Sequence, residues 1–213
     1  MTEKKIEDKI TLSKIIGHFV TITHHRHLVR KNCFKMGLYW QGLVHDLSKY
    51  TPAEFLIGAR CYQGTRSPNA REREIRGYST SWLHHKGRNK HHFEYWIDFF
   101  KKNEYGDGIV PVPMPDKYVA EMMADRVAAS MTYRGDAYDS WDSMKYYERE
   151  KEVLKHLVHP DTINKLEFFL TMIGEQGEDA TFKYIKEIFL KGKDRGRWEK
   201  ELEVQQNEQN RVI

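Results

Sequence analysis

The sequence predicts an all-α protein, a compact helical bundle of about seven to nine helices. Apolar residues recur at spacings of three and four residues through most of the chain, which is the period of an amphipathic helix. No alternating apolar pattern of useful length predicts a strand. The 213 residues, of which 39% are hydrophobic and 13% aromatic, suffice for one domain with a buried core and exclude a wholly disordered chain.

Three helices are expected in the first third of the chain, over 11–36, 38–48 and 52–62. Thr11 or Ser13 is suited to cap the first, because a hydroxyl oxygen accepts hydrogen bonds from the free N–H groups of a helix start. The third has a stronger start signal, since Thr51 precedes a proline at the first helical position and Glu54 follows at the third. We therefore expect these two residues to form a capping box.

The middle of the chain is expected to be less regular. Residues 63–79 are rich in Gly, Pro and Arg with few apolar anchors, which predicts a long loop with one helical turn at most, able to act as a lid. A helical pattern returns over 80–100, interrupted near Gly87 and Asn89. Alternating prolines in 105–115 exclude a helix there and predict an extended connector.

The rest of the chain is predicted to be helical up to a polar end. Helices are expected over 116–131, from Asp139 or Ser140 to about 157, over 160–173 and over 179–191. We expect residues 1–192 to form a single domain and residues 193–213 to form a protruding polar tail.

Composition and charge exclude several classes of protein. No apolar run approaches the ~20 residues of a transmembrane helix, and the start MTEKKIEDKI lacks the apolar centre of a secretory signal, so we expect a cytoplasmic protein without membrane partners. Cys33 and Cys61 fit two reduced thiols. Residues 1–100 hold 17 Lys and Arg against 9 Asp and Glu, so an anion would be drawn to that half, but no nucleic-acid-binding motif accompanies the charge.

Histidine, the commonest metal ligand, gathers in the same half of the chain. Nine of the 11 histidines precede residue 93. The adjacent pair His45-Asp46, near a predicted helix end, offers a nitrogen and a carboxylate suited to a divalent transition ion, and the aspartate can bridge to a second ion. His25 lies twenty positions upstream, in the first predicted helix.

A further carboxylate lies downstream, in the helix expected over 116–131. Asp125 and Glu121 are four residues apart, so they share a helical face, and their neighbours are apolar. A carboxylate on a face that tends toward burial needs a partner or a metal ion. The alternative for Asp125 is an ordinary surface residue paired with Arg126 or Lys117.

This ordered set of residues resembles the HD-domain metal-dependent phosphohydrolases, in which the motif order is His, His-Asp, Asp. The matching residues are His25, His45, Asp46 and Asp125. Lys49 matches the family position three residues after the aspartate, where a lysine is frequent. The chain looks like a diverged bacterial and phage branch of that superfamily. The resemblance implies a metal-site core over about 10–135, followed by a helical extension over about 136–192.

Many members of that superfamily hold a second ion with additional histidines. The candidates here are His84, His85, His91 and His92. Adjacent side chains diverge by about 100° on a helix, so we expect at most one of each pair to face an ion. The remaining histidines then lie at the surface or support the ligands. The expected cofactor is one or two divalent ions of Mn, Co, Ni, Fe or Zn.

The resemblance and the charges together predict a phosphate site. Asp46 and Lys49 are the expected catalytic residues. Phosphate binding is expected from Lys49, Arg71, Arg73, Arg76 and Arg88. The alternative for the arginines is a solvated stretch of mixed charge, since Glu72 and Glu74 lie between them.

The expected function is therefore a metal-dependent phosphohydrolase that acts on a nucleotide or another small phosphoester through metal-activated water. Two alternatives stay open at this point. Some HD proteins are di-iron oxygenases with the same ligands, and a non-catalytic helical binding protein would use its histidines for structure alone. Metal analysis of the purified protein separates the three.

Overall fold

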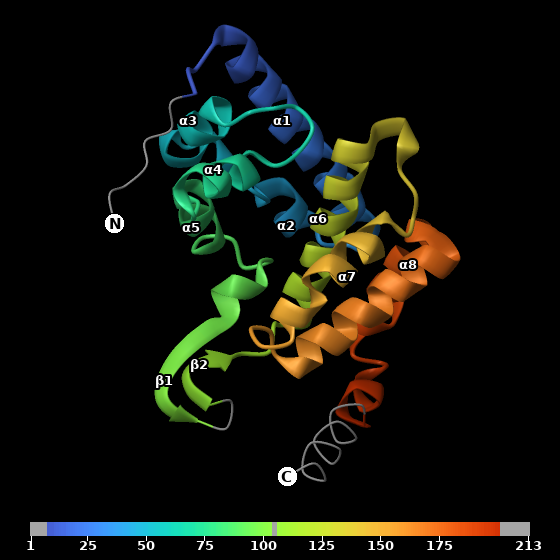
Figure 1. Cartoon of the computed structure of the whole chain (residues 1–213). Helices are drawn as coiled ribbons and strands as arrows, with labels where there is room; N and C mark the ends of the chain where they lie inside the picture. The colour runs from blue at the N-terminus through green and yellow to red at the C-terminus, as the bar shows by residue number, and fades with distance from the viewer. Residues whose placement is uncertain (1–7, 104–105, 201–213) are drawn as a thin grey trace.

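A computed structural model describes residues 8–103 and 106–200 of the chain (Figure 1). Its helices are α1 (Leu12–Lys35), α2 (Tyr39–Val44), α3 (Pro52–Arg60), α4 (Pro68–Arg76), α5 (Thr80–Lys86), α6 (Asp116–Arg134), α7 (Asp142–Leu154) and α8 (Pro160–Glu187). Short 3-10 turns lie at Leu47–Tyr50, Phe93–Trp96, Gly135–Ala137 and Phe189–Lys191. The predicted all-α bundle is confirmed, with the addition of one hairpin, β1 (Ile97–Asn103) and β2 (Gly106–Pro111).

Helix α6 lies at the centre of the bundle, where it packs against α1, α7 and α8. Its residues are apolar on most of its faces, and Val119, Met123 and Val127 are fully buried. A helix that is apolar nearly all round is stable only when other elements surround it. The same core continues through Tyr147 of α7 and Phe169 of α8, so the two ends of the chain share it.

The start of α1 agrees with the prediction, whereas the start of α3 does not. The Thr11 side chain accepts from the backbone N–H of Lys14 at 3.3 Å. Helix α3 begins at Pro52 as expected, but Thr51 donates its hydroxyl to the carbonyl of Ser48 and makes no cap. The expected capping box is wrong, because Glu54 binds histidines instead.

Residues 63–79 were expected to be a loop, and that expectation is wrong, because nine of them form α4. Pro68 takes the first turn of this helix, and Gly77 ends it with φ 85°. Apolar anchors are few, but the buried carboxylate of Glu72 accepts hydrogen bonds from Ser79, Thr80 and Ser81 at the start of α5. Polar contacts therefore hold α4 where a hydrophobic pattern does not.

The helix expected over 80–100 ends at Lys86, and the absence of strands was wrongly predicted. β1 and β2 pair antiparallel, with Phe99 opposite Ile109, and the hairpin projects from the bundle (Figure 1). Phe99 is 76% exposed and Phe100 62% exposed. Because both faces of this arm meet solvent, its sequence carries no alternation of buried and exposed residues to mark a strand.

The C-terminal third differs in two details. The helices expected over 160–173 and 179–191 form one helix, α8, with a kink at Gly177, where φ is 79° and ψ is 171°. Trp198 is buried against Phe169 and Phe189, so the first part of the predicted tail joins the core instead of protruding. The rest of that tail, 201–213, lies outside the described residues. No helix in the described part is long and apolar enough to cross a membrane.

Candidate metal centre

The turn that carries His45 and Asp46 is shaped by the end of α2 and by a contact from α1. Helix α2 ends because His45 leaves the helical conformation, with ψ 127°, and Asp46 takes the left-handed conformation, with φ 53°. Arg26 of α1 donates to the carbonyls of Leu43 and His45, at 3.1 and 2.7 Å, and satisfies the helix end. Among the described non-glycine residues, Asp46 alone has a positive φ, a strain that is typical of functional sites.

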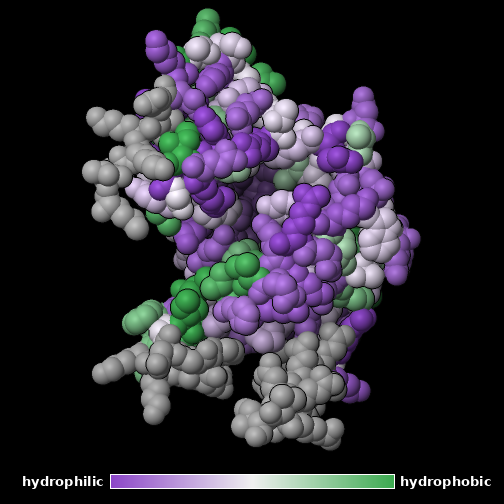
Figure 2. Space-filling view, in the orientation of Figure 1, coloured by the Kyte–Doolittle hydropathy of each residue, from purple (hydrophilic) through white to green (hydrophobic). Residues whose placement is uncertain are grey.

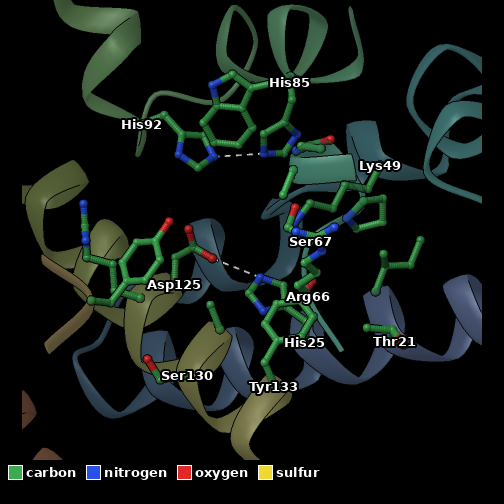
Figure 3. Close-up of a pocket in the computed structure, with 18 of the residues that line it drawn as sticks. Thr21, His25, Lys49, Arg66, Ser67, His85, His92, Asp125, Ser130 and Tyr133 are labelled. Atoms are coloured by element: carbon green, nitrogen blue, oxygen red, sulfur yellow. Dashed lines mark hydrogen bonds and ion pairs between the residues drawn. The ribbon is translucent and has the colours of Figure 1, made fainter. Parts of the chain in front are cut away.

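The first group of candidate ligands gathers at one carboxylate oxygen of Asp46. The group is His25, His45, Asp46 and Asp125, whose ligand atoms lie within 4.8 Å of one another. Nε2 of His25 lies 2.9 Å from Oδ1 of Asp125 (Figure 3), and Nε2 of His45 lies 3.3 Å from Oδ2 of Asp46. Helices α1 and α6 and the turn after α2 thus bring together four residues that are far apart in the sequence.

A second group gathers at the other oxygen of the same aspartate. It consists of Asp46, His85, His91 and His92. Nε2 of His85 and of His91 lie 3.2 and 3.4 Å from Oδ1 of Asp46, and Nε2 of His92 lies 2.9 Å from that of His85. The structure corrects the expectation that only one of His91 and His92 faces the site. Residues 87–92 are not helical, so the angular separation of neighbours on a helix does not apply.

Glu121 of α6 contacts one histidine from each group on the side away from Asp46. Its Oε1 lies 2.9 Å from Nδ1 of His45 and 3.2 Å from Nδ1 of His91. In the neutral form of each ring, which is the form that binds an ion, we assign the proton to Nδ1, which donates to the carboxylate and leaves Nε2 as the ligand atom. The sequence analysis placed Glu121 on the same helical face as Asp125, but it did not predict that Glu121 contacts His45 and His91.

Glu54 supports the second group in the same way. The sequence analysis had instead assigned Glu54 to a capping box with Thr51. Its carboxylate accepts from Nδ1 of His84 at 2.6 Å and from Nδ1 of His85 at 2.8 Å. His85 is buried and directs Nε2 at Asp46, whereas His84 is directed at Glu54 only. His84, a predicted ligand, therefore belongs to neither group.

The chemistry of these side chains fits a divalent ion. Nε2 of His25, His45 and His91 and Oδ1 of Asp46 are buried and make no well-aligned hydrogen bond in the described structure, although they lie 2.9 to 3.4 Å from one another or from Asp125 and Oδ2 of Asp46. Buried polar atoms without partners cost free energy, so such a cluster is unusual in a fold that has no use for it. Nitrogen and oxygen donors without sulfur suit Mn, Fe, Co, Ni or Zn.

The charges around Asp46 keep it ionised. Burial, the largest single effect, favours its protonated form, but His45 and Lys49 outweigh burial and hold the pKa of Asp46 well below its usual value. Nζ of Lys49 lies 2.6 Å from Oδ2 of Asp46. For His45 the reverse holds: burial lowers its pKa, but Asp46, Asp125 and Glu121 outweigh burial and raise it well above the usual value, so an ion that binds Nε2 displaces a proton from it. Asp46 can thus ligate a cation without first losing a proton.

Both groups lie at the floor of a cavity of about 830 Å³. Figure 3 shows His25, Lys49, His85, His92 and Asp125 directed into it, and Figure 2 shows the hollow in a largely hydrophilic face. Helices α3, α4 and α5 form one wall, and α6 and α7 form the other. The site is therefore open to a small molecule.

The predicted phosphate-binding arginines separate in the structure. Arg73 lines the cavity. Arg71 pairs instead with Asp8 at 3.2 Å, and Arg76 pairs with Glu72 at 3.6 Å. Arg88 donates to the carbonyl of His84. Of the four predicted arginines, Arg71, Arg76 and Arg88 are therefore not among the residues that line the cavity. Lys49 is the predicted cation that lies at the ligand groups.

The chain belongs to a family of unknown function (DUF5662), whose model matches residues 14–172. That span includes both ligand groups and the two supporting glutamates. No curated protein and no solved structure shows a significant match to the chain.

Proposed function

We propose that this chain is an HD-type metal-dependent phosphohydrolase that acts on small organic phosphates. One observation carries the proposal: the two oxygens of the buried Asp46 each face a separate group of ligand atoms, at the floor of a cavity open to solvent. His25, His45 and Asp125 would hold one ion with Asp46. His85, His91 and His92 would hold the other.

The surrounding residues suit phosphate chemistry. A divalent ion in such a site supplies Lewis-acid polarisation of a phosphoryl oxygen and lowers the pKa of a water bound to it. Lys49 lines the cavity, and Asp46 and Asp125 outweigh its burial and raise its pKa, so its ammonium group stays charged. That charge lies where it can neutralise a phosphate oxygen.

The same nitrogen and oxygen donors also suit iron, which keeps an oxygenase as the second candidate. Metal analysis separates the two, since manganese, cobalt or nickel supports hydrolysis and two irons per chain support oxygen chemistry.

The experiment is hydrolysis of para-nitrophenyl phosphate and bis-para-nitrophenyl phosphate by the purified protein with Mn²⁺, Co²⁺ or Ni²⁺. We expect turnover of at least one ester by the wild type and its loss in Asp46→Asn. Asparagine tolerates the left-handed backbone of this position, so the variant keeps the fold, which circular dichroism checks. Turnover that is absent from the wild type, or equal in both proteins, contradicts the proposal.

A further inference from the structure

The cavity has a basic outer wall that the metal groups do not explain. Five arginines line it, more than the carboxylates Glu94, Asp142 and Glu150 that share this outer part. Three of these arginines come from three different helices: Arg73 of α4, Arg126 of α6 and Arg149 of α7. Helices α4 and α7 lie apart from one another in the fold (Figure 1), yet all three arginines line the same cavity. Sequence reasoning singled out only Arg73.

Arg73, Arg126 and Arg149 are less tightly paired with carboxylates than another arginine of the same cavity. Arg66, which also lines the cavity, is held by Glu74 through two hydrogen bonds of 2.5 and 2.8 Å. In contrast, Arg149 has no ion pair within the described part of the chain, and Arg126 approaches Glu150 only to 3.9 Å. The guanidinium of Arg73 lies over the Trp82 ring at 5.4 Å and has no carboxylate partner among the described residues.

Contacts place Arg73 close to the metal groups, and its charge acts on a residue of the opposite wall. Trp82, under Arg73, contacts His92 with ring centroids 4.7 Å apart, so one indole separates the guanidinium from the second ligand group. On the other side, partial burial in the wall and Glu150 raise the pKa of Tyr146 to about 12, and Arg126 and Arg73 both oppose that rise. The charges of α4 and α6 thus reach the same phenol on α7.

The size of the cavity leaves room for more than one anionic group. A volume of about 830 Å³ lies in the range of sites for whole organic ligands, far above the needs of a lone phosphate. The wall of the same cavity also includes less polar residues such as Met122, Ala129 and Tyr133. A neutral body would lie against these residues.

We infer that Arg73, Arg126 and Arg149 bind a second anionic group of the substrate, so that the substrate class is an organic phosphate with an anion at each end. Guanidinium groups suit this role, because they bind phosphate or carboxylate oxygens with paired, charge-assisted hydrogen bonds. The inference rests on the proposed function for what happens at the first anion.

The test uses phosphonates, whose carbon–phosphorus bonds are not hydrolysed. Binding of α,ω-alkane diphosphonates of three to six carbons, and of alkylphosphonates of the same lengths, is measured by calorimetry on Mn²⁺-loaded protein. We expect at least one diphosphonate to bind about tenfold or more tightly than its matched monophosphonate. Arg73→Gln and Arg149→Gln should each remove most of that advantage and leave monophosphonate affinity unchanged.

Arg71→Gln is the matched control, because it removes the same charge from the same helix at a residue that pairs with Asp8. It should change neither affinity. Equal affinity for the two classes of phosphonate, failure of both to bind, or equal effects of Arg71→Gln and Arg73→Gln would overturn the inference. Phosphonate binding needs no turnover, so an intact diphosphonate preference without ester hydrolysis overturns the proposed function alone, and hydrolysis without the preference overturns the inference alone.

Discussion

Glu121 shows how a single side chain connects the two ligand groups. One of its oxygens accepts from His45, a member of the first group, and from His91, a member of the second. The rings of these two histidines lie 4.3 Å apart between their centroids. Glu54 has no such double role. Of the two histidines that it binds, only His85 is a candidate ligand, and His85 belongs to the second group.

This difference predicts unequal effects of two matched substitutions. Glu121→Gln should weaken binding of both ions by about 10- to 100-fold, because an amide accepts the Nδ1 protons less strongly and orients both rings less well. Glu54→Gln should weaken only the second ion by a similar factor. Calorimetric titration of the metal-free variants with Mn²⁺ measures each site.

The wild type titrated in parallel provides the reference for both variants. Two ions bound by Glu121→Gln with wild-type affinity, or a loss confined to one site, would show that Glu121 does not link the groups.

The ligands themselves were easier to predict than the residues that hold them. His25, His45, Asp46 and Asp125 stand out because their types and order carry chemistry, and the structure brings them together. Glu54 does not stand out, because a glutamate three residues after a threonine has the same pattern as a helix cap. No local pattern distinguishes the two roles when the partner histidines lie 30 and 31 residues away.

At the scale of elements, α5 depends on a carboxylate from its neighbour. Glu72 of α4 is fully buried and accepts from the hydroxyls of Ser79, Thr80 and Ser81 at 2.6 to 2.9 Å. It also accepts from the backbone N–H of Thr80 at 3.0 Å, at the free end of α5. The helix that carries His85 is thereby anchored to α4.

We predict that Glu72→Gln lowers the free energy of unfolding by about 1–3 kcal/mol at pH 7. Burial raises the pKa of Glu72, but the hydrogen bonds from Ser79 and Thr80 outweigh burial and lower it below its usual 4.5. The ionised carboxylate therefore stabilises the fold above pH 4.5, and this contribution disappears as the pH falls through the lowered value. Urea unfolding of both proteins at pH 7 and at pH 3 should show a difference that shrinks in acid. A difference of equal size at both values would refute the assignment.

Replacement of glycine by alanine should have opposite effects on stability at two positions of the chain. Gly177, at the kink of α8, has φ 79° and open space around it, so alanine there is strained by the backbone alone. Gly196 is helical and also has open space. Gly177→Ala should lower the melting temperature through a loss of about 1–2 kcal/mol, and Gly196→Ala should raise it through a gain of up to about 1 kcal/mol. Scanning calorimetry measures the melting temperature of both variants. A higher melting temperature for Gly177→Ala would contradict the positive φ at this kink.

The elements that the sequence predicted are those with an apolar stripe or a strong start signal. Helices α1, α3 and α6 have one or both, and their observed bounds lie close to the expected ones. Helix α4 has Pro68 at its start but no apolar stripe, and its contacts are ion pairs and hydrogen bonds made by Arg71, Glu72 and Glu74. The hairpin also lacks a signal, because solvent lies on both of its faces. Tertiary polar contacts and exposed strands leave little trace in hydrophobic periodicity.

At the scale of the whole molecule, the core and the candidate metal centre share α6. One side of this helix contributes Val119, Met123 and Val127 to the hydrophobic core, and Glu121 and Asp125 reach the ligand groups. The fold therefore holds the centre on a buried helix, while α4 and α7 face the cavity above it. Rigid elements of this kind position ligand atoms better than loops do.

The central claim is that Asp46 lies between two metal ions, and the number of ions per chain tests it most directly. Metal-free protein is loaded with Mn²⁺, freed of excess metal and analysed by mass spectrometry, beside Asp46→Asn prepared in the same way. We predict two ions per wild-type chain and less than one in the variant, because both groups share the Asp46 carboxylate. A wild-type protein without bound metal, or a variant that retains two ions, would contradict the claim.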